Sequence, residues 1–156
     1  MIDTESGAIQ TPDYDTLPVV TPTSRFFSEK RAWWSSDNSR VFFVDEARGA
    51  KTVRLLSWNI NNGKTQTLIE EQSDTCVKLY HTCDEIPVLL PLPETDELIW
   101  FSERNDWGHL YLYDTKTGKE KGVITGKGSS GEHIEWNVRS ILHYDASLRE
   151  IIIQTS

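Results

Sequence analysis

One strand-like pattern occurs three times along this chain. It occupies Ser39–Asp45, Asp96–Ser102 and Arg149–Thr155. Val41, Leu98 and Ile151 hold the same place in the three copies, at intervals of 57 (98 − 41) and 53 (151 − 98) residues. Each copy is rich in β-branched and aromatic residues, which favour strands. A repeat of this length with several short strands is typical of the blades of a β-propeller, each a four-stranded antiparallel sheet.

The turns repeat together with the strands. Gly63 and Gly118 lie 55 residues apart (118 − 63), and each follows an aromatic residue, Trp58 or Tyr113, by five positions. Glycine accepts the positive φ that tight turns between antiparallel strands require. The alternative is an ordinary meander or sandwich whose hairpins merely look alike. The joint match of strand and turn spacing favours the propeller.

The predicted fold is therefore all-β, with consecutive four-stranded antiparallel sheets. We expect blade units at about 25–70 and 86–126 and an incomplete unit at 132–156, after a Pro/Thr-rich tail or strap at 1–24. The strands expected in the first unit are Ala32–Trp34, Val41–Asp45, Val53–Trp58 and Gln66–Ile69. Within the tail, Val19-Val20 is an alternative edge strand.

A family resemblance lies in Trp100–Asp114, which reads W-F-S-E-R-N-D-W-G-H-L-Y-L-Y-D. It resembles the signature W-x-S-E-R-D-G-W-x-H-L-Y-L-Y-D of the N-terminal propeller of dipeptidyl peptidase IV-like serine peptidases. Asn105-Asp106 stands where that family usually has Asp-Gly. More weakly, Leu68–Thr75 resembles the family's linker L-x-E-E-x-S-x-T. Trp34–Ser39 resembles the blade opening W-S-P-D-G/S, with serine in place of proline.

The resemblance implies a piece, about two and a half blades, of an eight-bladed ring. It implies that the complete protein removes dipeptides, often after proline or alanine, with a Ser-Asp-His triad in a C-terminal α/β-hydrolase domain. The propeller would restrict substrate access and shape the peptide pocket, outside the cytoplasm (periplasmic or secreted). This chain contains no G-x-S-x-G nucleophile motif. The alternatives are a stand-alone propeller-type interaction module without peptidase activity, or a propeller unrelated to peptidases.

The candidate site residues are those of the signature, for which a structural role is expected. They are Trp100, Ser102, Glu103, Arg104, Trp107, Gly108, His109, Tyr111, Tyr113 and Asp114. The charged run Glu103–Asp106 could suggest an active site. Asn and Asp commonly hydrogen-bond the backbone of a turn, so a polar loop at a blade rim is the favoured interpretation.

A second acidic motif, Glu70-Glu71, needs comparison with the family. The family holds the free amino terminus of a peptide with a Glu-Glu pair that precedes a W-W-S-P blade opening. Here Trp33–Ser36 follows Phe27–Arg31, which has no adjacent glutamates. Glu70-Glu71 falls in a different connector, so we expect a solvated acidic surface and no substrate ligand there.

The two cysteines, Cys76 and Cys83, are the remaining candidates for covalent or metal chemistry. A disulfide between them would close a small loop in an oxidising compartment, and two buried free thiols are the alternative. A metal site with His81 and Asp84 lacks the paired C-x-x-C spacing of structural zinc sites. No metal, cofactor or catalytic residue is therefore predicted.

Gly126–Gly131 spells G-x-G-x-x-G, the pattern of dinucleotide-binding loops. Such a loop needs a helix after its last glycine to hold the phosphates. Glu132–Val138 alternates like a strand instead, so the glycine-rich segment is interpreted as a connector. It is also one residue short of a nucleophile elbow.

Charge and hydropathy limit the partners. The net charge of −8 argues against nucleic acid, which needs a clustered basic face. No apolar run reaches the roughly 20 residues that span a bilayer. An open set of blades exposes strand edges, so we expect either a homo-oligomer through those edges or edges covered by terminal segments. A peptide substrate is expected only in the full-length protein.

Overall fold

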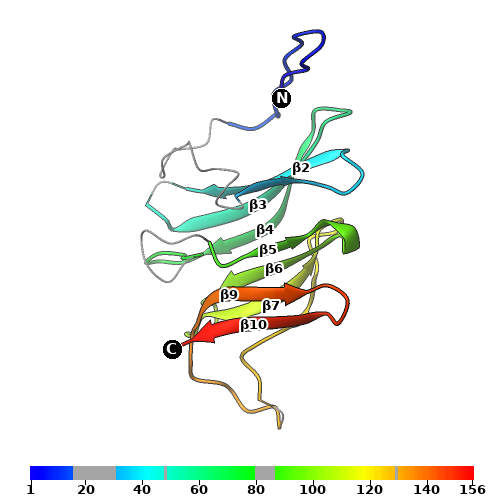
Figure 1. The fold of residues 1–156 in the computed structure, drawn as a ribbon. Coiled ribbons are helices and arrows are strands. Elements are labelled where there is room, and N and C mark those ends of the chain that lie inside the picture. The colour runs from blue at the N-terminus through cyan, green and yellow to red at the C-terminus, as the bar shows by residue number, and fades with distance from the viewer. Residues whose placement is uncertain (16–30, 48, 80–86, 129) are drawn as a thin grey trace.

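The computed structural model describes residues 1–15, 31–47, 49–79, 87–128 and 130–156. In this part of the chain, three antiparallel sheets follow one another, as Figure 1 shows from cyan through green to red. Within every sheet each strand pairs with its neighbour in sequence. No closed barrel forms among the described residues, and the predicted partial β-propeller is confirmed.

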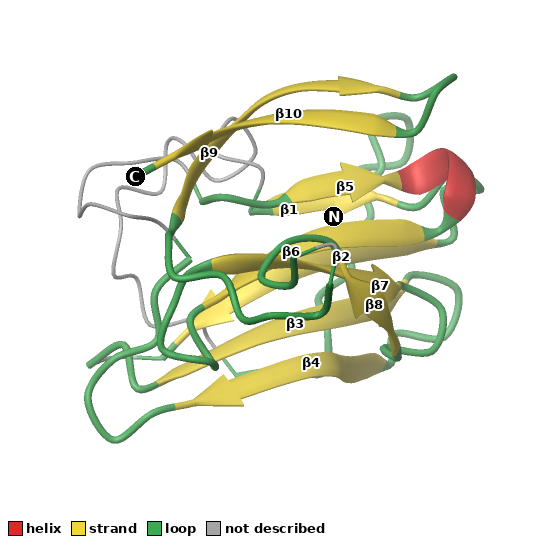
Figure 2. Cartoon of the chain, turned by 90° about the horizontal axis from the view of Figure 1, so that it is seen from below, coloured by secondary structure: helices red, strands yellow, loops and turns green. Residues whose placement is uncertain are grey.

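The first sheet contains β1 (Ala32–Trp34), β2 (Arg40–Glu46), β3 (Thr52–Asn59) and β4 (Thr65–Gln72). The second contains β5 (Leu90–Leu92), β6 (Glu97–Ser102), β7 (His109–Asp114) and β8 (Glu120–Val123), with one 3₁₀ turn, η2 (Pro93–Thr95), between β5 and β6. The third contains β9 (Val138–Asp145) and β10 (Glu150–Thr155). Figure 2 shows the same sheets from below.

The sequence repeat corresponds to repeated turn geometry. Gly63 and Gly118 have φ of 73° and 71°, and each donates its N–H, at 2.9 Å, to the carbonyl of the residue four positions earlier, Asn59 or Asp114. The side chains of Asn59 and Asp114 in turn accept N–H groups two and three residues ahead. The predicted hairpin turns with positive-φ glycine are therefore present in both four-stranded sheets.

Strand β6 lies in the middle of the stack and is buried along its whole length. Leu98 and Trp100 point into the core between the first and second sheets. Ile99 and Phe101 point into the core on the other side, shared with the third sheet. Because side chains alternate between the faces of a strand, a sheet covered on both faces needs a continuous apolar run, and this explains Leu98–Phe101.

A further core covers the outer face of the first sheet. It contains Ala32, Phe43, Leu56 and Trp58, with Tyr14 packed against it. The Tyr14 hydroxyl donates to Asp45 at 2.6 Å, and the ring meets Phe43 edge-on. Part of the N-terminal segment therefore contacts the first sheet. The alternative strand Val19-Val20 lies outside the described residues.

One sequence interpretation was wrong in this region of the fold. Of residues 132–138, which were expected to form a strand, only Val138 lies in one, as the first residue of β9; before it, a single bridge pairs Lys127 with His133. The Asn137 side chain instead accepts the Gly108 N–H, and the Ile134 carbonyl meets a β7 side chain. These groups bind Gly108 and His109 at the start of β7, so they are not available to pair with a strand.

Candidate functional site

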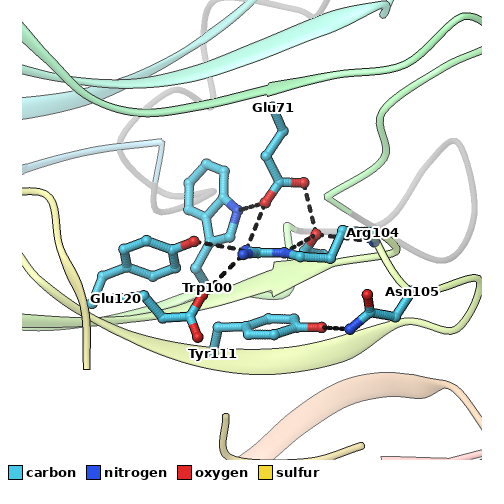
Figure 3. A network of polar contacts seen from close by, with 8 residues as sticks. Glu71, Trp100, Arg104, Asn105, Tyr111 and Glu120 are labelled. Atoms are coloured by element: carbon cyan, nitrogen blue, oxygen red, sulfur yellow. Dashed lines mark hydrogen bonds and ion pairs between the residues drawn. The ribbon is translucent and has the colours of Figure 1, made fainter. Parts of the chain in front are cut away.

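The polar centre of the molecule is Glu71, near the end of β4, at the junction of the first and second sheets. Its side chain is 15% exposed. One carboxylate oxygen accepts Trp100 Nε1–H at 2.9 Å and an Arg104 guanidinium N–H at 3.0 Å. The other accepts the Ser102 hydroxyl at 2.7 Å. One first-sheet carboxylate thus receives three donors from the second sheet (Figure 3).

Arg104 links Glu71 to the rest of this group, which we call the inter-sheet network. The network consists of Glu71, Trp100, Ser102, Arg104, Asn105, Tyr111, Tyr113 and Glu120. Arg104 Nε–H donates to Ser102 at 3.0 Å, one terminal nitrogen to Glu120 at 3.0 Å, and the other to Tyr113 at 2.7 Å as well as to Glu71. Four of its five N–H donors are therefore engaged within the protein.

The guanidinium also lies over an aromatic face, with Arg104 Cζ 4.0 Å from the Tyr111 ring centroid (Figure 3). Burial opposes the charge on Arg104, but the Tyr113 hydrogen bond and the Glu71 carboxylate outweigh it, and the pKa of Arg104 rises above its usual value. Burial raises the pKa of Tyr111 and of Tyr113, so both phenols stay neutral around it. The Arg104 guanidinium therefore has a structural role, since it binds to groups of the protein itself.

The turn that delivers Arg104 explains the departure from the family signature. Asp106 has φ of 69°, in the left-handed region, where the family usually has glycine. Aspartate adopts this conformation more readily than most residues. Its N–H donates to the Glu103 carbonyl at 3.1 Å, which closes the turn. Asn105 donates to the Tyr111 hydroxyl at 3.0 Å, as expected for a loop whose side chains hold the hairpin.

The other signature residues lie further along the hairpin. Gly108 packs so closely on Phe101 that an added Cβ would lie 2.4 Å from its ring. His109 is 1% exposed, Trp107 is half-buried and Glu103 is exposed. Asp114 accepts the N–H groups of the turn that follows β7.

No nucleophile is poised among these residues. Ser102 and His109 are opposite each other in the β6–β7 register, which superficially suggests a serine–histidine pair. The Ser102 hydroxyl donates to Glu71, however, and Ser102 is fully buried. A serine nucleophile needs a base free to take its proton and access to substrate, whereas this serine donates to a carboxylate that pairs with Arg104, and it is buried.

A groove of about 630 Å³ opens beside the inter-sheet network. It is lined by Glu70, Glu71, Gln72, Ser73, Thr75, Cys76, Val77, Lys78, Glu103, Arg104, Asp106 and Tyr113. Four of these residues are acidic and two are basic. Arg104 pairs with Glu71 and Glu70 pairs with Arg54, so Glu103 and Asp106, set against Lys78, give the remaining lining of the groove a small net negative charge.

The sequence interpretation of Glu70-Glu71 was wrong for one of the two residues. Both belong to β4, which is longer than expected, and not to a connector. Glu70 is a solvated surface residue, 40% exposed and paired with Arg54, whereas Glu71 is largely buried. The strand period of two was the missed signal, because Glu71 follows the buried Ile69 by two residues and shares its face.

The cysteine predictions stay predictions. Cys76 is half-buried, lines the groove and forms no disulfide with a described residue. Cys83 lies outside the described residues, as do His81 and Asp84. Within the described residues, no group of histidine, cysteine and carboxylate side chains could hold a metal ion.

Comparison with known proteins gives the family. The sequence profile of the dipeptidyl peptidase IV (DPP IV) N-terminal region matches residues 1–155. The chain belongs to this family. Among solved structures, the DPP IV N-terminal region of this chain is similar to a protein from Bacteroides ovatus assigned as a dipeptidyl aminopeptidase IV. The two share 22% sequence identity with a TM-score of 0.56, over 80% of this chain and 19% of the other, a likeness of fold.

The matched part of this chain therefore covers about a fifth of the length of that solved relative. In the described ranges, no helix has the length and apolar character needed to cross a membrane.

Proposed function

We propose that this chain is a non-catalytic propeller segment of a DPP IV-like serine exopeptidase, where it helps to restrict substrate access and to shape the peptide pocket. The family match over residues 1–155 supports this proposal. The inter-sheet network adds to it, because the signature residues hold two blades together and present a groove beside them. In this proposal the catalytic triad belongs to a separate α/β-hydrolase domain.

The charges of the groove predict which peptides it favours. Glu103 and Asp106 line it from the β6–β7 turn, and Glu70 lines it from β4. Glu71 already receives three donors, one of them the Arg104 cation, and its side chain is only 15% exposed, so it is a poor ligand for a peptide amine. The exposed carboxylates favour peptides that carry positive charge as they approach the pocket.

The test uses the protein that contains this chain together with its hydrolase domain. Glu103→Gln and Asp106→Asn each keep the turn geometry and remove one groove charge. We expect a higher KM for cationic dipeptide-releasing substrates with kcat unchanged, and less effect on neutral ones. Glu150→Gln, at the exposed first residue of β10, is the matched control. Equal kinetics in all three variants would contradict the role of the groove.

A second measurement tests the peptidase assignment itself. We expect residues 1–156 alone not to hydrolyse a Gly-Pro-type chromogenic dipeptide, while the protein that includes the hydrolase domain does. Hydrolysis by the isolated chain would overturn the non-catalytic role. No hydrolysis by either would favour an interaction module.

We also propose that, as an isolated chain, this segment associates with a second copy of itself through the third sheet. Among the described strands β10 pairs with β9 alone, which leaves its other edge open. Leu142, Leu148 and Ile152 are 61%, 65% and 56% exposed beside that edge. Exposed strand edges next to apolar side chains promote association.

Light scattering across a concentration series tests this association. We expect a dimer of 1–156 that Ile152→Lys converts to a monomer. Lys119→Glu, at the exposed β7–β8 turn, is the control and is expected to leave the dimer intact. A wild-type monomer at all concentrations would contradict the proposal.

A further inference from the structure

His109 is the most enclosed titratable ring in the described chain, and the inter-sheet network does not use it. It begins β7 and is 1% exposed. Around it lies the connector that joins the second sheet to the third, which we define as residues 125–128 and 130–137. The Ile134 carbonyl lies 3.0 Å from Nε2, and the Thr125 hydroxyl lies 3.2 Å from Nδ1.

These two partners fix the protonation of the ring. A carbonyl can only accept, so Nε2 carries a hydrogen and donates it to Ile134. Thr125 Oγ1 already accepts the Leu110 N–H at 2.9 Å, so its own hydrogen is free to point at Nδ1. The neutral Nε2–H imidazole thus satisfies every group in the chain of hydrogen bonds. A second proton, on Nδ1, would force the Thr125 hydroxyl to turn its hydrogen away and accept through its remaining lone pair, and it would place a positive charge in an enclosed site.

Three residues of the connector pack closely on the His109 ring. Trp136 and His133 meet it edge-on, with ring centroids 5.5 and 6.1 Å away. Gly126, at φ of 99°, approaches so closely that a Cβ would lie 2.7 Å from the imidazole. A pocket of about 110 Å³ adjoins the ring. The connector therefore depends on His109 for much of its contact with β7.

We propose that His109 is a pH-sensitive pin, which in its neutral form holds the connector and the third sheet against β7 and on protonation releases them. The charged groups near the ring reinforce the effect. His133 and Lys127, both from the connector, line the same pocket as His109. Tyr111, from β7, also lines it and stays neutral. Among the described residues no carboxylate contacts either ring nitrogen to compensate the added charge.

The direction of the pH effect follows from burial. Burial lowers the pKa of His109 below its ordinary 6.5, and repulsion from His133 acts the same way, against the opposing Ile134 hydrogen bond. The docked state therefore binds fewer protons than the released state. Its stability is complete above pH 6.5 and is lost as the pH falls through the lowered pKa. Carboxylates that are hydrogen-bonded in the fold lose their contribution at still lower pH, as for Asp37, whose pKa is lowered to about 2.

Nitrogen-15 NMR of the imidazoles in wild-type 1–156 is the first test. We expect the His109 ring as the Nε2–H tautomer at pH 7.5, with a titration midpoint below the ordinary histidine value of 6.5. A midpoint at or above 6.5, or an Nδ1–H tautomer, would overturn the proposal. This measurement needs no substitution and cannot be confused with misfolding.

Hydrogen exchange of the connector amides between pH 7.5 and 5, corrected for intrinsic rates, is the second test. In wild type we expect protection of residues 130–137 to fall by up to about tenfold for each pH unit between 6.5 and the lower His109 midpoint, and to level off below that midpoint. His109→Gln keeps a donor for the Ile134 carbonyl but does not titrate, so its protection should be independent of pH. His143→Gln should behave as wild type. The same pH dependence in His109→Gln as in wild type would refute the pin.

Discussion

The two junctions between the sheets use the same kinds of contact to different extents. At the junction of the first and second sheets the described core contains twelve buried hydrophobic residues, with only Trp33 and Leu68 partly exposed. At the junction of the second and third sheets, six residues are buried and seven partly exposed ones complete the core. The first junction is a protein interior, and the second is a half-covered surface.

At each junction a largely buried carboxylate binds groups of the next sheet, and the exposure of those groups determines how strong the contact is. Glu71 receives Trp100 and Ser102, which are both fully buried, and Arg104, whose side chain is 32% exposed. Glu97, 2% exposed, receives Lys121 from its own sheet and Arg149 from the third at 2.9 Å. Arg149 is 53% exposed, so water competes for this contact. The Glu71 contacts at the first junction are therefore expected to be stronger than the Glu97–Arg149 ion pair at the second.

The largest expected effect comes from two adjacent residues of β6 that point to opposite junctions. Trp100→Ala should lower the free energy of unfolding of 1–156 by about 5 kcal/mol, because it opens a cavity in a closed core and leaves Glu71 short of a donor. Phe101→Ala should cost about 3 kcal/mol, since the partly exposed second core can relax into the space. Urea titration gives both values. An equal or larger loss for Phe101→Ala would refute the difference between the junctions.

The repeated turns provide a second matched pair. Gly63 and Gly118 have nearly the same φ, but a Cβ at Gly63 would meet open space, whereas one at Gly118 would lie 2.3 Å from the Leu68 carbonyl of the first sheet. Gly63→Ala should cost about 1 kcal/mol for the left-handed backbone alone. Gly118→Ala should cost about 3 kcal/mol, because the junction must also open. Thermal unfolding distinguishes the two variants. Identical melting temperatures would mean that the backbone at Leu68 shifts at little energetic cost to accept the new Cβ.

Removal of the negative charge from the first carboxylate bridge should have an intermediate effect. Glu71→Gln preserves the shape but replaces one acceptor with a donor among three donors, at a cost of about 2 kcal/mol. Glu70→Gln, one residue earlier and exposed, should cost less than about 0.5 kcal/mol. Chemical denaturation of both variants measures the pair. If the two losses agree, Glu71 contributes no more than a surface carboxylate.

The smallest effect is expected at the second bridge. Burial opposes ionisation of Glu97, but hydrogen bonds from Lys121, Thr95 and Arg149 outweigh it and lower its pKa. A lowered carboxylate pKa gives stability that is present above the unfolded value and lost as the pH falls through the folded one. Arg149→Ala should therefore cost about 0.5–1 kcal/mol at pH 7.

The pH profile of that variant provides its control. The stability difference between wild type and Arg149→Ala should shrink below pH 4.5, as Glu97 becomes protonated in both. A difference that persists unchanged in acid would assign the loss to packing of the arginine stem.

Sequence alone predicted the fold better than the site. The repeated strands and turns are local, because hydrophobic alternation and a positive-φ glycine determine each hairpin, and β1 was placed at its observed residues. The partners of Glu71 lie 29 to 33 residues away in the next sheet, so no local pattern reveals them. Residues 132–138 alternate like a strand. Their polar groups, however, bind Gly108 and His109 at the start of β7, and this tertiary contact overrides the local preference.

The pairing of every strand with its neighbour in sequence has a consequence for synthesis of the protein. The first sheet is complete at Gln72, before any strand of the second has been translated. A nascent chain can therefore finish each sheet as it leaves the ribosome and add the next onto a folded template, so that assembly proceeds in one direction along the message.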